Sequence, residues 1–408
     1  MKIEKMSEKQ AQILDFVVSD DLYLICDGAV RTGKTVFMSA GFLIWAMEYF
    51  DRTNFAICGK TVQSVERNVL KPLQENESLP YTLEYKVSTK LLTVRCGTKE
   101  NYFYIFGGKD ESSYMLIQGI TLAGVLLDEV ALMPRSFVEQ ALARTISYDL
   151  PKIWFNCNPQ SPNHYFYKEW IEEQKEGTTH LHFLLEDNPI LSPKMIERTK
   201  AMYSGVFYDR YIRGLWVVSE GLIYPMFGKD STVPTEEREY TRYVISVDYG
   251  IQNPTAMLLW GFCDGVWYQV NEFYHSGRET GRQKTDQEYY EDLERLAGER
   301  YVESLIIDPS ATSFIALVKQ KKRFKVRHAR NNVVAGIQAT ASAIQQGKIK
   351  VNDCCKRTIQ EYGLYSWDSK TDRDAPIKDN DHAMDATRYF VNTMGLVKIK
   401  SEYTPLWN

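Results

Sequence analysis

The chain has 408 residues, a length that favours two domains over one hydrophobic core. A composition of 44% hydrophobic and 25% charged residues is typical of a folded globular protein and argues against a disordered one. The net charge of −4 does not indicate a nucleic-acid-binding protein, although a local basic face can still contact phosphates. No apolar run reaches the ~18 residues of a membrane span, so no membrane partner is expected. The seven cysteines form no C-x-x-C pair and suit a reducing cytoplasm.

Short apolar runs alternate with amphipathic stretches in the first half of the chain. This alternation predicts an α/β fold with a mostly parallel, buried sheet. Strands are expected at residues 23–27, 54–59, 91–96, 102–107, 124–128, 152–157 and 180–185, and helices at 36–49, 62–73 and 135–147. The run 91–107 is expected to form a hairpin attached to the sheet.

Residues 28–35 fit the phosphate-binding pattern G-x-x-x-x-G-K-[ST] between an expected strand and an expected helix. Gly28 and Gly33 let backbone N–H groups surround the phosphates of ATP. Lys34 is expected to reach the β and γ oxygens, and Thr35 to bind Mg²⁺. The alternative is an accidental glycine-rich turn, which the strand and helix on either side disfavour.

Two acids, Asp128 and Glu129, follow the apolar strand expected at 124–128. Asp128 suits magnesium binding, and Glu129 suits polarising the attacking water. The same pair is also compatible with a helix N-terminus. The phosphate-binding loop upstream favours the functional interpretation.

Three further residues carry weaker signals for the same site. Asn158 either senses the γ-phosphate or belongs to a simple Asn-Pro turn. Arg31 points either to the γ-phosphate or to solvent. Gln10 either contacts adenine or is a surface glutamine.

The regular pattern loosens from residue 187 to 240, where Gly and Pro indicate a linker. A second α/β pattern follows, with strands expected at 242–248, 256–262, 266–274 and 304–308 and helices at 285–297, 312–320 and 381–394.

Three carboxylates occupy suggestive places in this second half. Asp248 and Asp308 end two strands, and Asp385 lies near the start of the last helix, three residues after His382. Such acids can hold two Mg²⁺ or Mn²⁺ ions roughly 3.5–4 Å apart. Each acid taken alone is also compatible with a cap or a turn, and His382 is a ligand, a proton shuttle or an ordinary helix residue.

A basic stretch at residues 319–330 follows the element of Asp308. It either tracks a DNA backbone or is a solvated helix end and loop.

Together these motifs resemble the large terminase subunit of tailed bacteriophages, and the similarity covers nearly the whole chain. The resemblance rests on residues 28–35, 126–129, 215–216, 221–227, 247–250, 253–256 and 381–389. It implies an ASCE-type P-loop ATPase domain at 1–205, a linker at 206–240, an RNase H-like nuclease at 241–395 and a tail at 396–408.

The resemblance also implies roles for individual residues. Arg31 would couple hydrolysis to movement, Glu129 would be the hydrolytic base, and residues 156–159 would form the coupling motif. Asp248, Asp308 and Asp385 would be metal ligands with His382 close by. Some members carry an arginine able to act in trans where this chain has Gln118, so such an arginine must come from elsewhere, with Arg135 and Arg144 as candidates.

The function expected from the resemblance is ATP-driven movement of double-stranded DNA into a procapsid and cutting of concatemeric DNA. The expected partners are a portal protein, a small terminase subunit and further copies in a ring, in the host cytoplasm and transiently on the procapsid. A helicase-nuclease of DNA repair or defence is the alternative, and an assembly factor with a decayed nuclease is a second one.

Overall fold

The computed structural model describes residues 5–203, 205–250, 253–368 and 374–397. These residues form two compact units. Unit 1 holds the described residues up to Ala201 together with Val206–Val218. Unit 2 holds Met202, Tyr203 and Gly205 together with the described residues from Ser219 to Val397. Residues 206–218, which fall in the expected linker, thus pack with unit 1. Most of the expected tail, residues 398–408, lies outside the described residues.

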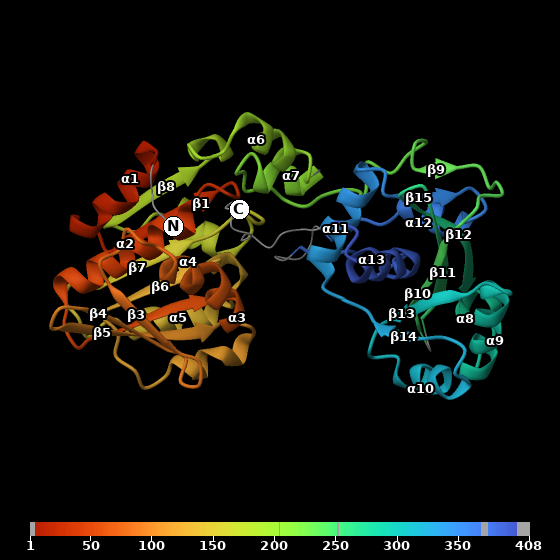
Figure 1. The fold of residues 1–408 in the computed structure, drawn as a ribbon, viewed down its shortest axis with the longest axis horizontal. Helices are drawn as coiled ribbons and strands as arrows, with labels where there is room; N and C mark the ends of the chain where they lie inside the picture. The colour runs from red at the N-terminus through yellow and green to blue at the C-terminus, as the bar shows by residue number, and fades with distance from the viewer. Residues whose placement is uncertain (1–4, 204, 251–252, 369–373, 398–408) are drawn as a thin grey trace. The chain divides into compact units, whose positions relative to one another are not determined.

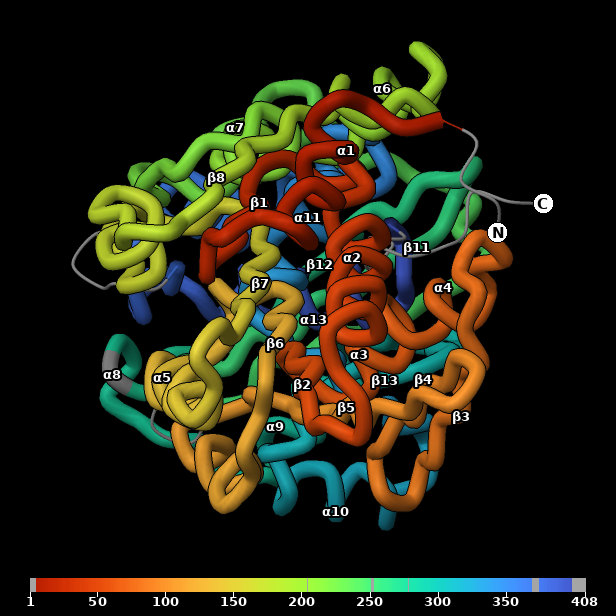
Figure 2. The backbone as a smooth tube through the Cα atoms, turned by 90° about the vertical axis from the view of Figure 1, so that its left-hand side faces the viewer, coloured from red at the N-terminus to blue at the C-terminus, as the bar shows by residue number. Residues whose placement is uncertain are grey.

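Unit 1 is built on an eight-stranded sheet with the order β3-β4-β5-β2-β6-β7-β1-β8. The strands from β5 to β8 in this order are parallel, and β3, β4 and β5 form an antiparallel meander at one edge (Figure 2). The strands are β1 Tyr23–Gly28, β2 Asn54–Gly59, β3 Thr82–Lys86, β4 Leu91–Cys96, β5 Lys99–Gly107, β6 Gly124–Asp128, β7 Lys152–Asn156 and β8 Thr178–Phe183.

The helices of unit 1 cover both faces of this sheet. They are α1 Glu8–Asp15, α2 Lys34–Tyr49, α3 Val62–Val65, α4 Lys71–Gln74, α5 Arg135–Ala143, α6 Pro193–Lys200 and α7 Gly205–Tyr211. Successive strand residues point to opposite faces, so Trp154 of β7 packs with the side chains of α2 while Phe155 packs with those of α5. Burial on both faces explains the near-continuous apolar runs of the sequence.

Unit 2 contains a seven-stranded sheet with the order β14-β13-β10-β11-β12-β15-β9. An antiparallel meander, β10-β11-β12, is followed by β13 and β14 added in parallel beside β10, as in an RNase H-like fold. The strands are β9 Thr232–Val233, β10 Arg242–Asp248, β11 Thr255–Cys263, β12 Val266–His275, β13 Val302–Ile307, β14 Val326–His328 and β15 Ile349–Asn352.

Helices cover this second sheet on both faces (Figure 1). They are α8 Gly277–Thr280, α9 Asp286–Ala297, α10 Thr312–Lys321, α11 Val333–Gln345, α12 Lys356–Tyr362 and α13 His382–Met394. On one face α9 and α10 bury Leu293 and Phe314 among the strand side chains. On the other face, Phe390 of α13 stacks on Trp260 of β11 with ring centroids 4.2 Å apart.

The expected α/β fold is confirmed in both units, and most differences are shifts at element ends. The helix expected at 62–73 contains a π-helical stretch, Glu66–Leu70, and the helix expected at 135–147 ends at Ala143. The sequence patterns do not predict four of the strands and six of the helices, namely β3, β9, β14, β15, α1, α6, α7, α8, α11 and α12.

Candidate nucleotide-binding and nuclease sites

The phosphate-binding loop leaves β1 at Gly28 and enters α2 at Lys34. Gly28 has φ +119°, and a Cβ atom there would lie 2.1 Å from the carbonyl oxygen of Phe183. Gly33 has φ +85° and caps α2. Both positions therefore require glycine, and the loop between them leads directly to the positive end of a helix, where anions are favoured.

Lys34 is buried, and its ammonium group points into this loop. Its Nζ donates hydrogen bonds to the carbonyl oxygen of Ala29 at 2.6 Å and to Oδ1 of Asn158 at 3.2 Å. Asn158, the candidate γ-phosphate sensor, thus lies beside the loop lysine.

Thr35, Asp128 and Asn156 meet where α2 begins and where β6 and β7 end. Thr35 Oγ1 donates to Asp128 Oδ1 at 3.2 Å, and Asn156 Nδ2 donates to both oxygens at 2.8 and 2.6 Å. Asn156 Oδ1 is buried, and no hydrogen-bond donor among the described residues reaches it. A hydroxyl, a carboxylate and a free amide oxygen fit a hard cation such as Mg²⁺.

The sequence indicates Asn156 only as part of the coupling motif, residues 156–159, that the family resemblance implies. Its place at the end of a buried strand next to β6 is the signal that would have identified it.

Glu129 directly follows Asp128 and has the left-handed backbone angles φ 58° and ψ 43°. Because such a conformation is disfavoured outside glycine, its presence beside the phosphate-binding loop is typical of a functional position.

Gln10 lies next to the loop, and the alternative that it is a surface glutamine is wrong. Its side chain is 1% exposed, and its Nε2 donates to the carbonyl oxygen of Thr32 at 2.8 Å. Asn188 also supports the loop, since its Nδ2 donates to the carbonyl oxygen of Arg31 at 2.7 Å. The Arg31 backbone is left-handed, with φ +60°.

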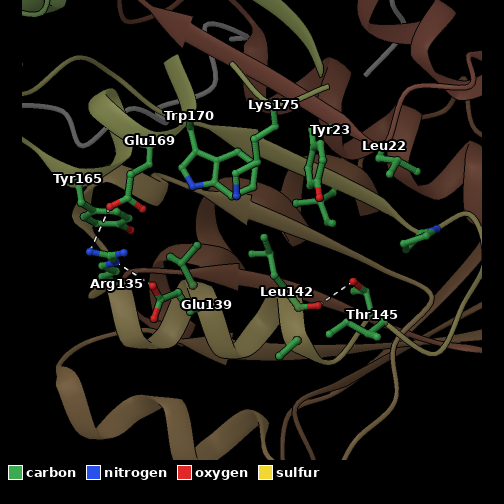
Figure 3. A pocket seen from close by; sticks show the side chains of 15 residues that line it. Leu22, Tyr23, Arg135, Glu139, Leu142, Thr145, Tyr165, Glu169, Trp170 and Lys175 are labelled. Carbon is green, nitrogen blue, oxygen red and sulfur yellow. Dashed lines mark hydrogen bonds and ion pairs between the residues drawn. The ribbon is translucent and has the colours of Figure 1, made fainter. Parts of the chain in front are cut away.

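A separate pocket of about 510 Å³ lies between α5 and the segment that follows β7 (Figure 3). Its lining includes Tyr23 and Ile153, at the starts of β1 and β7, so the pocket lies at the opposite end of these strands from the phosphate-binding loop. Arg135, a candidate trans-acting arginine, lines this pocket. Its guanidinium is paired with Glu139 at 2.8 Å and with Glu169 at 3.1 Å.

In unit 2 the topology brings the predicted acids to one end of the sheet. Val247 of β10 is the register partner of Ile307 of β13, and Asp248 and Asp308 follow these two residues. The helix α13, which carries Asp385, packs against β10, β11 and β13. The three predicted acids therefore lie on, or directly after, neighbouring elements of unit 2.

His382 and Asp248 form a close pair, with Nδ1 2.8 Å from Oδ2. Burial raises the pKa of Asp248, and the nearby Asp385 carboxylate adds to this rise, although the hydrogen bond from His382 opposes it. Burial lowers the pKa of His382, but the hydrogen bond and charge of Asp248 outweigh it and leave that pKa above its usual value. The two groups therefore hold a proton between them more tightly than either would alone.

Arg388 and Asn331 link the other two acids. Arg388 Nη2 lies 2.9 Å from Asp385 Oδ1, and its Nη1 donates to the carbonyl oxygen of Asn331 at 2.7 Å. Asn331 Nδ2 donates to Asp308 Oδ2 at 2.8 Å. Although burial raises the pKa of Asp308, hydrogen bonds from Ser310, Asn331 and Tyr389 hold it below its usual value.

The carboxylate oxygens of this site are the kind of donor that Mg²⁺ or Mn²⁺ prefers. The Lys378 ammonium, 3.5 Å from Asp381 and 3.9 Å from Asp385, marks a place where positive charge is favoured. Within the described ranges, however, no three His, Cys, Asp or Glu side chains are grouped closely enough to hold a metal ion. Asp248, Asp308 and Asp385 are instead each bonded to the neighbouring side chains named above.

Comparison with known proteins agrees with this two-unit architecture. Residues 25–228 match the family described as terminase large subunit, T4likevirus-type, N-terminal. The crystal structure of a large terminase from a thermophilic bacteriophage is 48% identical, with a TM-score of 0.90 over 96% of this chain and 99% of that one. The chain belongs to the large terminase family. Structures of the same phage protein with ADP and with ATP-γ-S are each 47% identical over 95% of this chain and 99% of the other, with TM-scores of 0.88 and 0.87.

As a large terminase subunit, the chain is a viral DNA-packaging ATPase and a DNA endonuclease. The near-full-length similarity does not favour the helicase-nuclease alternative. Among curated proteins, none matches the chain. None of the helices in the described part of this terminase is long and apolar enough to cross a membrane.

Proposed function

We propose that unit 1 binds ATP and Mg²⁺ in the phosphate-binding loop and hydrolyses the nucleotide to move double-stranded DNA. The contact that carries this proposal joins Thr35, Asp128 and Asn156 within hydrogen-bonding distance of one another. Thr35 and Asp128 hold the magnesium, which neutralises charge on the phosphates when bound. Gly28 and Gly33 present backbone N–H groups to the phosphates.

The remaining residues of this site complete the proposal. Lys34 neutralises the β and γ oxygens, and Glu129 orients and deprotonates the attacking water. Asn158, already bonded to Lys34, responds to the γ-phosphate. Arg31 contacts the γ-phosphate and couples hydrolysis to movement. Gln10 fixes the loop backbone beside the nucleotide, close to where adenine binds.

Unit 2 is proposed to cut DNA with Asp248, Asp308 and Asp385 as ligands of Mg²⁺ or Mn²⁺. These carboxylates would hold the metal, which when bound would activate a water and stabilise the leaving oxygen. His382 orients Asp248 and holds a proton next to it. Arg388 keeps Asp385 in place through its 2.9 Å ion pair.

The proposed domains are a motor at residues 1–205, a linker at 206–240, of which residues 206–218 pack with unit 1, a nuclease at 241–395 and a tail at 396–408. The proposed partners are a portal protein, a small terminase subunit and further copies of this chain in a ring. The proposed place of action is the host cytoplasm, with transient docking on the procapsid. Co-sedimentation with purified portal rings tests this part, and absence of binding with ATP and DNA present would contradict it.

DNA-stimulated ATP hydrolysis tests the assignments in unit 1. Lys34→Ala and Glu129→Ala are expected to lose the activity while keeping the thermal unfolding midpoint of the wild type within a few degrees. Full ATPase activity in Glu129→Ala would overturn the assignment of the base. Cutting of supercoiled plasmid with Mn²⁺ tests unit 2, where Asp248→Ala is expected to be inactive.

A further inference from the structure

A basic surface runs along one edge of the second sheet up to the nuclease acids. Residues 319–330 contain seven Lys or Arg and no Asp or Glu, although the whole chain has a net charge of −4. All seven cationic side chains are exposed, as is His328. We call this surface the basic edge: Lys319, Lys321, Lys322, Arg323, Lys325, Arg327, His328 and Arg330.

The fold connects the basic edge to the cutting site. It begins at the end of α10 and continues through β14, the edge strand beside β13 (Figure 1). His328 is the register partner of Ile307, the residue before Asp308. Asn331, the residue after the basic edge, donates its hydrogen bond to Asp308. The charges therefore lead directly to one of the three acids.

The helix that carries Asp385 also anchors this edge. Arg330 N donates to Thr393 Oγ1 at 2.9 Å, and Asn392 Nδ2 donates to the carbonyl oxygen of Arg330 at 2.8 Å. Arg327 Nη2 donates to the carbonyl oxygen of Thr393 at 2.7 Å. These contacts fix the backbone of the basic edge relative to α13, while the Arg330 side chain stays exposed.

We propose that the basic edge binds the phosphate backbone of duplex DNA and holds the flanking segment of the strand that unit 2 cuts. The inference rests on the proposed nuclease function. At about 3.3 Å per residue, β14 with two residues on either side spans roughly 20 Å. One DNA strand offers a phosphate about every 3.4 Å along the helix axis, so such a length corresponds to roughly six phosphates of one strand, of which those turned towards the protein can be contacted. The contacts carry no base specificity, because they reach only phosphates.

Protection of an exposed strand edge against aggregation is the other use of such charges. A strand of three residues needs few charges for that purpose, whereas the basic edge extends beyond the strand in both directions. Among the described residues, only Arg323 of this edge forms an ion pair with an acid, Glu294 at 3.2 Å. No described residue forms a hydrogen bond or ion pair with the side chains of Lys319, Lys325 or Arg330.

The test is binding of a 30-base-pair duplex without divalent metal, measured over a range of NaCl concentrations with the full chain. The variant Lys319→Gln, Lys325→Gln, Arg330→Gln removes three charges without shortening the side chains much. The matched control is Lys229→Gln, Lys350→Gln, Lys356→Gln, which removes three charges near β9 and β15 at the opposite edge of the sheet.

The proposal predicts that the first variant binds the duplex about tenfold to a hundredfold more weakly near 0.1 M salt, with a slope of log K against log salt shallower by about 2 to 3. The control is expected to match the wild type. Equal affinities and slopes for both variants would overturn the proposal. Plasmid cutting by the same wild-type sample separates the two claims, because a failure to cut contradicts the nuclease assignment, whereas unchanged binding with normal cutting contradicts only the basic edge.

Discussion

The indole N–H of Trp216 donates a 2.7 Å hydrogen bond to Oδ2 of Asp27, the residue that precedes the phosphate-binding loop. The other carboxylate oxygen of Asp27 lies 2.9 Å from ring nitrogens of both His180 and His182. Asp27 itself is 1% exposed. One buried carboxylate therefore ties the end of β1 to β8 and to the segment that follows α7. Residues 215–216 contribute to the family resemblance, and this bond gives Trp216 a structural role.

Asp27→Asn is expected to destabilise unit 1 by about 2–4 kcal/mol at pH 7, because it weakens hydrogen bonds to a buried charge. Burial alone would raise the pKa of Asp27, but the hydrogen bonds and charge of His180 and His182 hold it well below its usual value. A depressed carboxyl pKa stabilises the fold above the pKa of the unfolded chain and loses this effect as the pH falls. The difference in unfolding free energy between wild type and variant, measured by urea denaturation, is therefore expected to shrink below about pH 4. A pH-independent difference would contradict this account.

Glu361 is expected to make the stability of the fold depend on pH in the sense opposite to that of Asp27, and Glu361→Gln is expected to remove this dependence. Glu361 Oε2 accepts hydrogen bonds from the backbone N–H groups of Ala383 at 2.7 Å and Met384 at 3.2 Å, in the first turn of α13. Burial raises the pKa of Glu361 to about 7. A raised carboxyl pKa stabilises the fold below the unfolded pKa, and this stabilisation is lost as the pH rises through about 7.

Between pH 4.5 and 7.5 the wild type is therefore expected to lose about 3 kcal/mol of stability relative to Glu361→Gln. The Gln side chain keeps an oxygen that accepts the two N–H groups, so the start of α13 is retained. Parallel stability curves for the two proteins over this pH range would show that Glu361 does not titrate in it.

Gly28→Ala is expected to damage the phosphate-binding loop more than an ordinary glycine substitution. The new Cβ would lie 2.1 Å from the carbonyl oxygen of Phe183, in a backbone conformation that L-residues rarely adopt. Gly97→Ala is the control, because Gly97 has φ +58° but nothing within 4 Å of a new Cβ. Gly97→Ala is expected to cost about 1 kcal/mol, and Gly28→Ala more than about 3 kcal/mol together with nucleotide binding. Equal thermal unfolding of the two variants would contradict the steric argument.

Asn156→Ala is expected to raise the Mg²⁺ concentration needed for half-maximal ATPase activity by about tenfold to a hundredfold. Its side-chain amide donates hydrogen bonds to both proposed ligands, Thr35 and Asp128, so its loss removes one restraint on each of them. The measurement is a magnesium titration at saturating ATP, with Asn163→Ala as a control beyond the coupling motif. A wild-type magnesium requirement in Asn156→Ala would remove this residue from the site.

Much of the architecture follows from apolar patterning. The strands β2, β4, β6 and β10 begin and end where the sequence predicts, because their apolar runs are bounded by polar or glycine residues. In contrast, β14 and β9 have three and two residues, too few for any period to appear. The helix α11 consists mostly of Ala and other apolar residues and is buried from Gly336 to Ile344, so its sequence shows no alternation between an apolar and a polar face.

The candidate sites likewise contain some residues that the sequence pattern predicts and others that it does not. Motif residues such as Lys34 and Asp128 were predictable because strand ends and helix starts are visible in sequence. Gln10 and Arg388 act through contacts that only the folded chain creates, 22 residues away in the case of Gln10 and Thr32. The bond between Asn331 and Asp308 is likewise set by the pairing of β13 with β14, which no local pattern encodes.

The most direct test of the account measures two activities in the same preparations: DNA-stimulated ATP hydrolysis, and cutting of supercoiled plasmid with Mn²⁺. Three proteins are compared, namely the wild type, Glu129→Gln and Asp308→Asn, the two substitutions being close to isosteric. Two independent sites in one chain predict that Glu129→Gln loses hydrolysis but cuts plasmid without ATP, while Asp308→Asn hydrolyses ATP but does not cut. Loss of both activities in either variant, with the fold intact by circular dichroism, would contradict the assignment of the two reactions to separate units.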